Sequence, residues 1–199
     1  MDHRTQQQRR EKAEAALLNA AAELVVEDGV QSLTLARIAE RAGYSRGLPT
    51  HYFGSKQVLL QHLARTSQTG YVPGLSGPPG LDRLLRLIDG YIAALGQMKM
   101  PNRAFLLLWA EATTNAELAQ IFRERDQAFR AGLRQDIAAG IANGTIRPDI
   151  SAGDAAVALL AQLRGIGLQR LVDSPAVDTE RLRQSVTEHW RLALVPAQA

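Results

Sequence analysis

The sequence predicts an all-α protein of about nine helices, arranged in two domains. Ala, Leu and Arg dominate the composition and only 5% of the residues are aromatic, which favours helices over sheets. Apolar residues recur at three- and four-residue spacing along most of the chain. Gly and Pro are densest over residues 70–80, so we expect a loop there between an N-terminal domain (9–68) and a larger C-terminal helical domain (81–195).

Composition excludes several kinds of site. The chain has no cysteine and its 4 histidines lack ligand spacing, so we expect no disulfide, no metal and no other cofactor. The N-terminus has no apolar signal segment, and no apolar run approaches the roughly 18 residues that span a membrane. We therefore expect a cytoplasmic protein without a membrane partner. The net charge of +3 is compatible with nucleic-acid binding but does not indicate it.

The first helix is predicted over residues 9–28, after a loose polar arm at 1–8 and before Gly29, which ends it. Its apolar stripe consists of Ala13, Leu17, Ala20, Ala21, Leu24 and Val25. Three basic residues, Arg9, Arg10 and Lys12, lie near its start. They are either a solvated helix start or a group that binds DNA phosphates.

Two short helices joined by a Gly-containing turn are predicted over residues 34–53. Thr34 should cap the first helix, which ends at Gly43 and has Arg37 and Arg41 pointing away from helix 9–28. Its buried positions are Leu35, Ile38 and Ala39. Ser45 should cap the second. This is the helix-turn-helix arrangement, in which the second helix enters the major groove of DNA.

Four short motifs follow one another in this region: T-L-x-x-I-A-x-x-A-G at 34–43, S-R-G at 45–47, H-Y-F at 51–53 and G-S-K at 54–56. In order and spacing they resemble the DNA-binding module of the TetR family of bacterial transcriptional regulators. The sequence departs from the family pattern at Pro49 and Thr50. The resemblance implies a DNA-binding regulator, with a double-stranded operator as partner, and not an enzyme.

The recognition helix supplies most of the predicted DNA contacts. We expect Arg46 to contact a guanine edge and Leu48 a thymine methyl group. Ser55 should cap a further helix that runs to about Gln68. The resemblance implies that Lys56, in the first turn of this helix, contacts a phosphate. The full set is Thr34, Arg37, Tyr44, Ser45, Arg46, Gly47, Leu48, Thr50, His51, Tyr52 and Lys56.

The second half of the sequence predicts further helices. Pro101 should break the first of them, at 81–98. The others are expected at 103–113, at 116–143, from Ser151 or Asp154 to 173, and at 178–195. W-A-E, N-x-E-L at 115–118 and G-x-I-R-P-D at 144–149 resemble the regulatory domain of the choline-responsive, BetI-like type of TetR regulator. This resemblance implies a domain that binds an unknown small-molecule effector and forms a homodimer.

Two residue sets follow from these helices. Apolar walls and a few polar groups typical of a ligand pocket are predicted at Tyr91, Phe105, Trp109, Phe122, Arg125, Asp126, Phe129 and Gln162. Surplus apolar surface on the last two helices predicts a dimer interface at Leu159, Leu163, Ile166, Leu171, Leu182, Val186, Trp190 and Leu194. For the pocket residues, an ordinary core or solvent-facing position is the open alternative.

Alternative functions remain open from the sequence. Gly43-Tyr44-Ser45-Arg46-Gly47 matches the G-x-S-x-G motif of hydrolases, but that chemistry needs a strand before the serine, and a helix is predicted there. A transcriptional activator of the same family, or an interaction module that no longer binds DNA, are the other two. The favoured interpretation is a dimeric repressor that binds a palindromic operator and is released by its effector.

Overall fold

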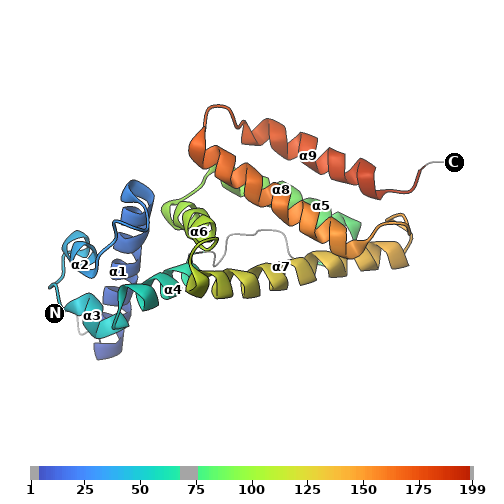
Figure 1. The fold of residues 1–199 in the computed structure, drawn as a ribbon. Helices are drawn as coiled ribbons and strands as arrows, with labels where there is room; N and C mark the ends of the chain where they lie inside the picture. Colours follow the sequence, from blue (N-terminus) through green and yellow to red (C-terminus); the bar gives the residue numbers. More distant parts are fainter. Residues whose placement is uncertain (1–4, 68–75, 198–199) are drawn as a thin grey trace. The chain divides into compact units, whose positions relative to one another are not determined.

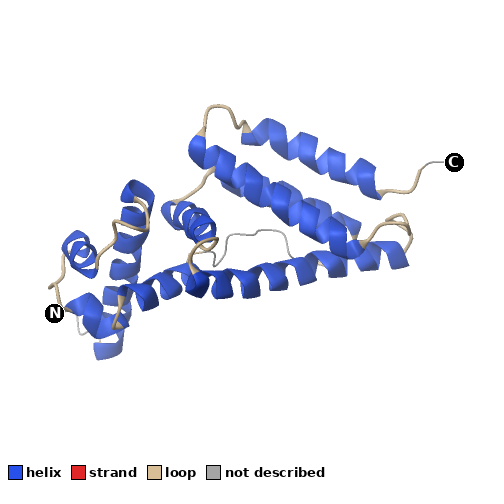
Figure 2. Cartoon of the chain, viewed as in Figure 1, coloured by secondary structure: helices blue, strands red, loops and turns tan. Residues whose placement is uncertain are grey.

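The computed structural model describes residues 5–67 and 76–197, which form helices and connecting turns without a strand (Figures 1 and 2). The helices are α1 (Gln6–Asp28), α2 (Leu35–Ala42), α3 (Leu48–Phe53), α4 (Lys56–Thr66), α5 (Leu81–Gly96), α6 (Met100–Glu111), α7 (Ala116–Ala142), α8 (Ala152–Val172) and α9 (Thr179–Leu194). The predicted all-α class is confirmed.

The chain divides into two compact units. The first comprises residues 1–69 and 99–122, and the second comprises residues 70–98 and 123–199. The predicted domains, 9–68 and 81–195, are each continuous in sequence. The units are not continuous, because α6 packs against α1 and α4 of the first unit.

Helix α1 begins earlier than predicted. Thr5 caps it, because its side chain accepts a hydrogen bond from Gln8 N at 3.3 Å while Thr5 N donates to Gln8 Oε1 at 2.9 Å. This reciprocal capping box satisfies backbone donors that the first turn would otherwise leave free. The arm predicted at 1–8 is therefore helical from Gln6, and residues 1–4 lie outside the described residues. Gly29 ends the helix as expected, at φ 78°.

Helices α2 and α3 form the predicted helix-turn-helix. The Thr34 side chain accepts from Arg37 N at 3.2 Å, and Gly43 ends α2 in the left-handed conformation at φ 74°. The prediction that Ser45 caps α3 is wrong, since α3 begins at Leu48 after Gly47, and Arg46 lies in the turn. A helix that began at Ser45 would bring the Pro49 ring against the carbonyl of residue 45, whereas the observed start leaves Pro49 in the first turn.

Helix α6 also differs from its prediction. We expected Pro101 to break the preceding helix and α6 to begin at Arg103, but α6 begins at Met100 and includes Pro101 in its first turn. Proline is tolerated there because that backbone donor has no helical partner. The buried face of α6 consists of Ala104, Phe105, Leu106 and Leu108.

The second unit has a core supplied by α5, α7, α8 and α9. Its largest fully buried side chains come from α5, among them Leu84, Ile88, Tyr91, Ile92 and Leu95. Helix α5 packs against α8 and α9. These residues form the inner face of α5, and Leu85 of the same helix is only partly buried.

The dimer interface predicted from the sequence is corrected by this core. Leu159, Leu163, Ile166, Val186 and Leu194 are buried within a single chain. Leu171, Leu182 and Trp190 are partly buried, the last two packed against the same core. The five buried side chains fill the interior of one chain and cannot also form the surface between two chains, whereas Leu171, Leu182 and Trp190 stay a prediction.

Helix α8 is long and apolar enough to cross a membrane by length and composition alone, contrary to the expectation that no apolar run approaches that length. Its inner face supplies Leu159, Leu160 and Leu163 to the core of the second unit. The same face carries Arg164, whose exposed fraction is 2%. We therefore describe α8 as a core helix of this unit.

Candidate nucleic-acid interface

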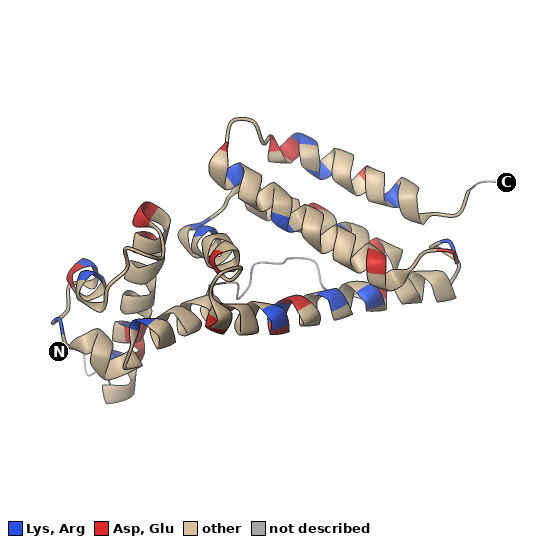
Figure 3. Ribbon diagram, in the orientation of Figure 1, with Lys and Arg blue, Asp and Glu red and all other residues tan. Residues whose placement is uncertain are grey.

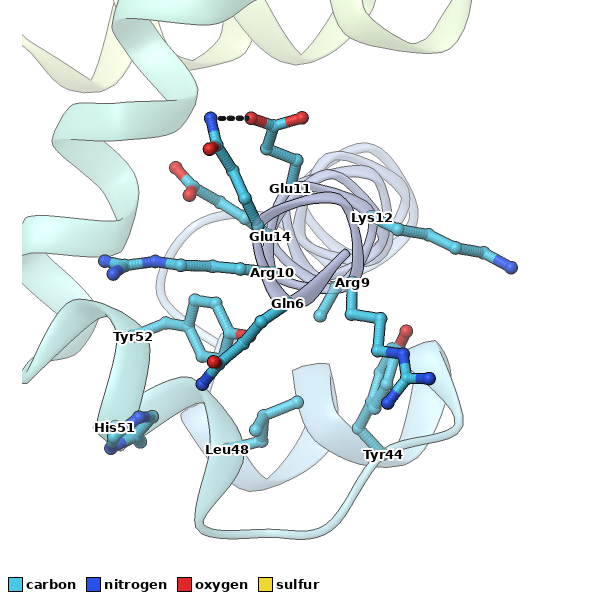
Figure 4. Close-up of a pocket in the computed structure, with 12 residues that line it drawn as sticks. Gln6, Arg9, Arg10, Glu11, Lys12, Glu14, Tyr44, Leu48, His51 and Tyr52 are labelled. Atoms are coloured by element: carbon cyan, nitrogen blue, oxygen red, sulfur yellow. Dashed lines mark hydrogen bonds between the residues drawn. The ribbon is translucent and has the colours of Figure 1, made fainter. Parts of the chain in front are cut away.

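A hollow in the first unit lies between the start of α1 and the recognition helix α3 (Figure 4). Helix α1 contributes Gln6, Gln7, Arg9, Arg10, Glu11, Lys12, Ala13 and Glu14, and the helix-turn-helix contributes Tyr44, Leu48, His51 and Tyr52. Arg10 lies 5.8 Å from the centre of the Tyr52 ring, within the range of a cation–π interaction. The hollow thus joins predicted DNA-contacting residues to the basic start of α1.

The recognition helix α3 has one buried face and one face exposed to solvent. Pro49 and Phe53 are buried, and Phe53 meets the His62 ring edge-on at 5.4 Å, which fixes α3 on α4. Thr50 and His51 are exposed, while Leu48 and Tyr52 are half-buried. Arg46 is exposed in the turn before α3. Polar groups on the open side of a short helix suit contacts to base edges and phosphates.

The two arginines of α2 form ion pairs with acidic residues of α1. Arg41 Nη2 lies 2.6 Å from Glu27 Oε2 and Arg41 Nη1 lies 3.3 Å from Glu23 Oε2. Figure 3 colours acidic positions red at one end of α1 and basic positions blue in α2. Arg37 pairs with Asp28 and donates to the Ser32 carbonyl at 3.0 Å. We predicted that Arg37 and Arg41 point away from the first helix. That prediction is wrong, because both return to acidic residues at its C-terminal end.

This pairing has an electrostatic consequence. The hydrogen bond from Arg41 lowers the pKa of Glu27 below its ordinary value of 4.5. Glu27 and Glu23, in turn, raise the pKa of Arg41. Charges that are satisfied within the chain have less to gain from a phosphate, so Arg37 and Arg41 are weaker candidates for DNA contact than Arg46.

Lys56 lies in the first turn of α4, as predicted. The Ser55 side chain caps this helix by accepting from Val58 N at 3.2 Å. Lys56 Nζ donates to the Gln31 carbonyl at 3.3 Å, and an ammonium group keeps further donors for a phosphate. The helix N-terminus adds its own attraction for an anion.

Three basic residues outside the predicted contact set belong to this surface. Arg9, Arg10 and Lys12 are exposed and line the hollow. Figure 4 shows Arg9 extending toward Tyr44 and Arg10 lying beside Tyr52. The sequence offered a signal, a basic cluster preceding a helix-turn-helix, but could not show that the cluster reaches the recognition helix.

A second polar cluster lies inside the second unit. Arg164 Nη1 donates to the Tyr91 hydroxyl at 2.7 Å, and Arg164 Nη2 lies 3.4 Å from Asp126 Oδ1. Burial raises the pKa of Tyr91, against the opposing charge of Arg164, so the phenol stays neutral. Burial and then Arg164 lower the pKa of Arg125, while Asp126 opposes that change. Sequence reasoning missed Arg164.

The remaining predicted pocket residues are divided between the units. Phe129 packs edge-on against Tyr91 in the second unit, with ring centres 6.4 Å apart. Gln162 Oε1 accepts from Trp190 Nε1 at 2.7 Å, so its side chain joins α8 to α9. Phe105 and Phe122 pack together in the first unit at 5.2 Å, and Trp109 lies in the same unit. The predicted set is therefore not a single cluster within one unit.

Comparison with known proteins decides the family. Residues 80–194 match the family described as BetI-type transcriptional repressor, C-terminal, and residues 17–63 match the bacterial regulatory proteins of the tetR family. The chain belongs to the TetR family. It is a DNA-binding transcriptional regulator with a BetI-type C-terminal domain, as the sequence motifs predicted.

Two relatives of this TetR regulator illustrate the match. The transcriptional regulator BetI 1 of Chromohalobacter salexigens is 27% identical over 176 residues, which span 84% of this chain and 83% of that protein. BetI of Escherichia coli is 26% identical over 181 residues, 87% of this chain and 89% of that protein. These relatives are transcriptional regulators and not enzymes, which confirms the prediction of a non-enzymatic function.

Solved structures of TetR-like proteins share the fold. A transcriptional regulator from Saccharomonospora viridis, in complex with choline, superimposes with a TM-score of 0.78 at 21% identity, covering 94% of this chain and 99% of that one. NalD of Pseudomonas aeruginosa, the secondary repressor of the MexAB-OprM multidrug efflux pump, gives a TM-score of 0.77 at 24% identity, covering 96% and 99%. At these identities the likeness establishes the architecture alone.

Proposed function

We propose that this TetR-family protein is a homodimeric repressor that binds a palindromic operator in the bacterial cytoplasm and is released by a small-molecule effector. The observation that carries the proposal is the exposed surface around α3. Arg46, Thr50 and His51 face outward there, and the basic start of α1 lies beside them. The match to a repressor family favours repression over activation.

The dimer would form through the outer face of α8, in place of the five predicted residues that are buried within one chain. That face is apolar along the helix, and its exposed members include Val157 at 53% and Val172 at 89%. Between them lie Ala158, Ala161, Gly165 and Leu168. A Cβ atom on Gly165 would meet nothing within 4 Å, so the face is open in one chain. A twofold axis would place two such stripes together.

The effector would contact the polar cluster of Tyr91, Asp126 and Arg164. A buried guanidinium is costly unless it is paired, so such a cluster in the interior of a regulatory unit is a good candidate for ligand recognition. A cation such as choline would compete with Arg164 for Asp126, whereas a carboxylate would compete with Asp126 for Arg164. Effector release requires only that the ligand bind two conformations unequally.

Selection from random duplex DNA, followed by sequencing, tests the proposal. The expected result is an enriched palindrome whose half-sites are one helical turn, or a multiple of it, apart. Recovery of unrelated sequences, or of a site without twofold symmetry, would contradict a dimeric repressor. The enriched duplex then serves to screen small molecules, with choline included, by their ability to release the protein.

The dimer face is tested separately by light scattering. Ala161→Arg should convert the dimer to a monomer, because a charge would be buried at the centre of the stripe. Gln184→Arg, on the exposed face of α9, is the matched control and should leave the mass unchanged. Equal masses for wild type and Ala161→Arg would place the interface elsewhere.

A further inference from the structure

The corner between α6 and α7 (residues 111–115) is joined by side chains to the DNA-binding helices. Gln31 Nε2, in the loop between α1 and α2, donates to Glu111 Oε1 at 2.5 Å. The carbonyl of the same Gln31 accepts from Lys56 Nζ at 3.3 Å. Gln31 therefore connects Glu111, at the end of α6, to the lysine at the start of α4.

A second connection lies next to the first. Asn115 caps α7, since its Oδ1 accepts from Leu118 N at 3.1 Å. The same oxygen accepts from Gln57 Nε2 at 3.2 Å, and Gln57 follows Lys56 in α4. One amide oxygen thus holds the N-terminus of α7 and the first turn of α4 together. Lys56 is flanked by two links to the corner.

The loop that carries Gln31 is itself firmly held. Its apolar residues Val30 and Leu33 are buried. The Ser32 hydroxyl donates to the Asp28 carbonyl at 2.8 Å, and the Ser32 carbonyl accepts from Arg37. The Gln31 carbonyl therefore has a defined position, and its hydrogen bond from Lys56 orients the ammonium.

The α6–α7 corner belongs to a segment that the chain enters from the second unit and leaves to the second unit. The segment from residue 99 to 122 packs in the first unit but is preceded and followed by residues of the second unit. Two of the three places where the chain passes between the units, at 98–99 and 122–123, flank this segment. The α6–α7 corner lies within this segment and so belongs to the first unit.

We propose that Glu111 and Gln31 are positioning residues for DNA binding, which hold the Lys56 ammonium at a phosphate. The proposal rests on the proposed function for its assignment of Lys56 to a phosphate. It assigns no DNA contact to Glu111 or Gln31. The α6–α7 corner thereby becomes part of the DNA-binding unit, although it lies far along the sequence.

The test is a double-substitution cycle on duplex DNA at several salt concentrations. Lys56→Met should lower affinity about tenfold and reduce the slope of log affinity against log salt by about 0.9, the value for one phosphate contact. Glu111→Ala should lower affinity about threefold and also reduce the slope. In the double variant, Glu111→Ala should add nothing, since the ammonium it positions is gone.

Glu111→Gln retains an acceptor and should restore binding, which separates positioning from a general loss of stability. Glu117→Ala is the matched control, because Glu117 accepts from Gln61 of α4 at 3.0 Å, farther from Lys56. Its salt slope should equal that of the wild type. Additive effects of the two substitutions, or an unchanged slope for Glu111→Ala, would overturn the inference.

Using both the selected operator and a scrambled duplex keeps the two proposals distinct. A phosphate contact is independent of sequence, so the cycle should give the same coupling on either duplex. Coupling on the scrambled duplex supports the positioning role even if no palindrome is enriched. A wild-type protein that binds neither duplex would overturn the positioning role and the proposed function together.

Discussion

Among the described residues, the charged side chains of the first unit remain at least partly exposed, whereas in the second unit Asp136 and Arg164 lie in the interior, exposed by 1% and 2%. Arg41 of α2 reaches two carboxylates without leaving solvent. Asp136 instead accepts from Arg83 Nε at 2.6 Å and from Gly80 N at 3.1 Å, and so anchors the start of α5. The surface pairs remain solvated, whereas the interior charges are largely removed from water and depend on their partners.

The difference is consistent with the role proposed for each unit. Exposed cations such as Arg46 and those at the start of α1 are available to DNA. In the unit proposed to bind the effector, each buried charge requires a specific partner. The comparison can be tested by removing one charge or one contact at a time.

The largest effect should come from the interior of the second unit. Asp136→Ala should lower the free energy of unfolding by about 3–5 kcal/mol, since it leaves Arg83 largely buried without its carboxylate. Asp149→Ala is the matched control, because Asp149 is 69% exposed in its pair with Arg147 and should cost about 0–1 kcal/mol. Urea denaturation measures both. Equal losses would remove the distinction between the two kinds of charge.

A smaller change in the free energy of unfolding is expected from the packing of α7. Gly140→Ala would place a Cβ atom 2.5 Å from Ile146 Cδ1, in the buried return of the chain after α7, and should cost about 1–3 kcal/mol. Gly132→Ala, on the same helix, meets nothing within 4 Å and should stabilise by about 0.5–1 kcal/mol. Thermal unfolding should show a lower Tm for Gly140→Ala and a higher Tm for Gly132→Ala. The same sign for both variants would contradict the tight interior described for this unit.

The smallest effect concerns the surface pairs of the first unit. Because Arg41 lowers the pKa of Glu27 in the folded state, this pair contributes stability above the ordinary pKa of 4.5, and the contribution is lost as the pH falls through the folded value. An NMR titration should place the Glu27 midpoint below 4.5 in wild type and close to 4.5 in Arg41→Ala. An unchanged midpoint would mean that the pair does not persist in solution.

Much of the first unit could be predicted from the sequence, because local signals agreed with one another. Thr34, Gly43 and Ser55 each set a helix end by backbone chemistry that needs no tertiary information. Arg46 was predicted in the recognition helix but lies in the turn before it. Pro49 is tolerated only in the first turn of a helix, so α3 begins at Leu48. Glu23 and Glu27 are four residues apart at the end of α1, a spacing that offered a signal for the arginine pairing.

The second unit was harder, for a physical reason. Helix α8 is apolar on both faces, so periodicity identifies residues on a common face but not which face is inside. The larger residues, such as Leu159 and Leu163, were assigned to the dimer and lie in the core. Arg164 follows Leu160 and Leu163 on that inner face, and only the distant partners Tyr91 and Asp126 explain it.

The measurement that tests the central claim most directly compares Arg46→Ala with Arg41→Ala on the selected operator and on each of its single-base variants. Arg46→Ala should lose about 1–3 kcal/mol of binding free energy and relax discrimination at one base position in each half-site. Arg41→Ala, whose guanidinium is already paired within the chain, should change affinity by less than about twofold at every position. Equal losses for the two variants would contradict the claim that free and paired arginines divide the DNA-binding surface.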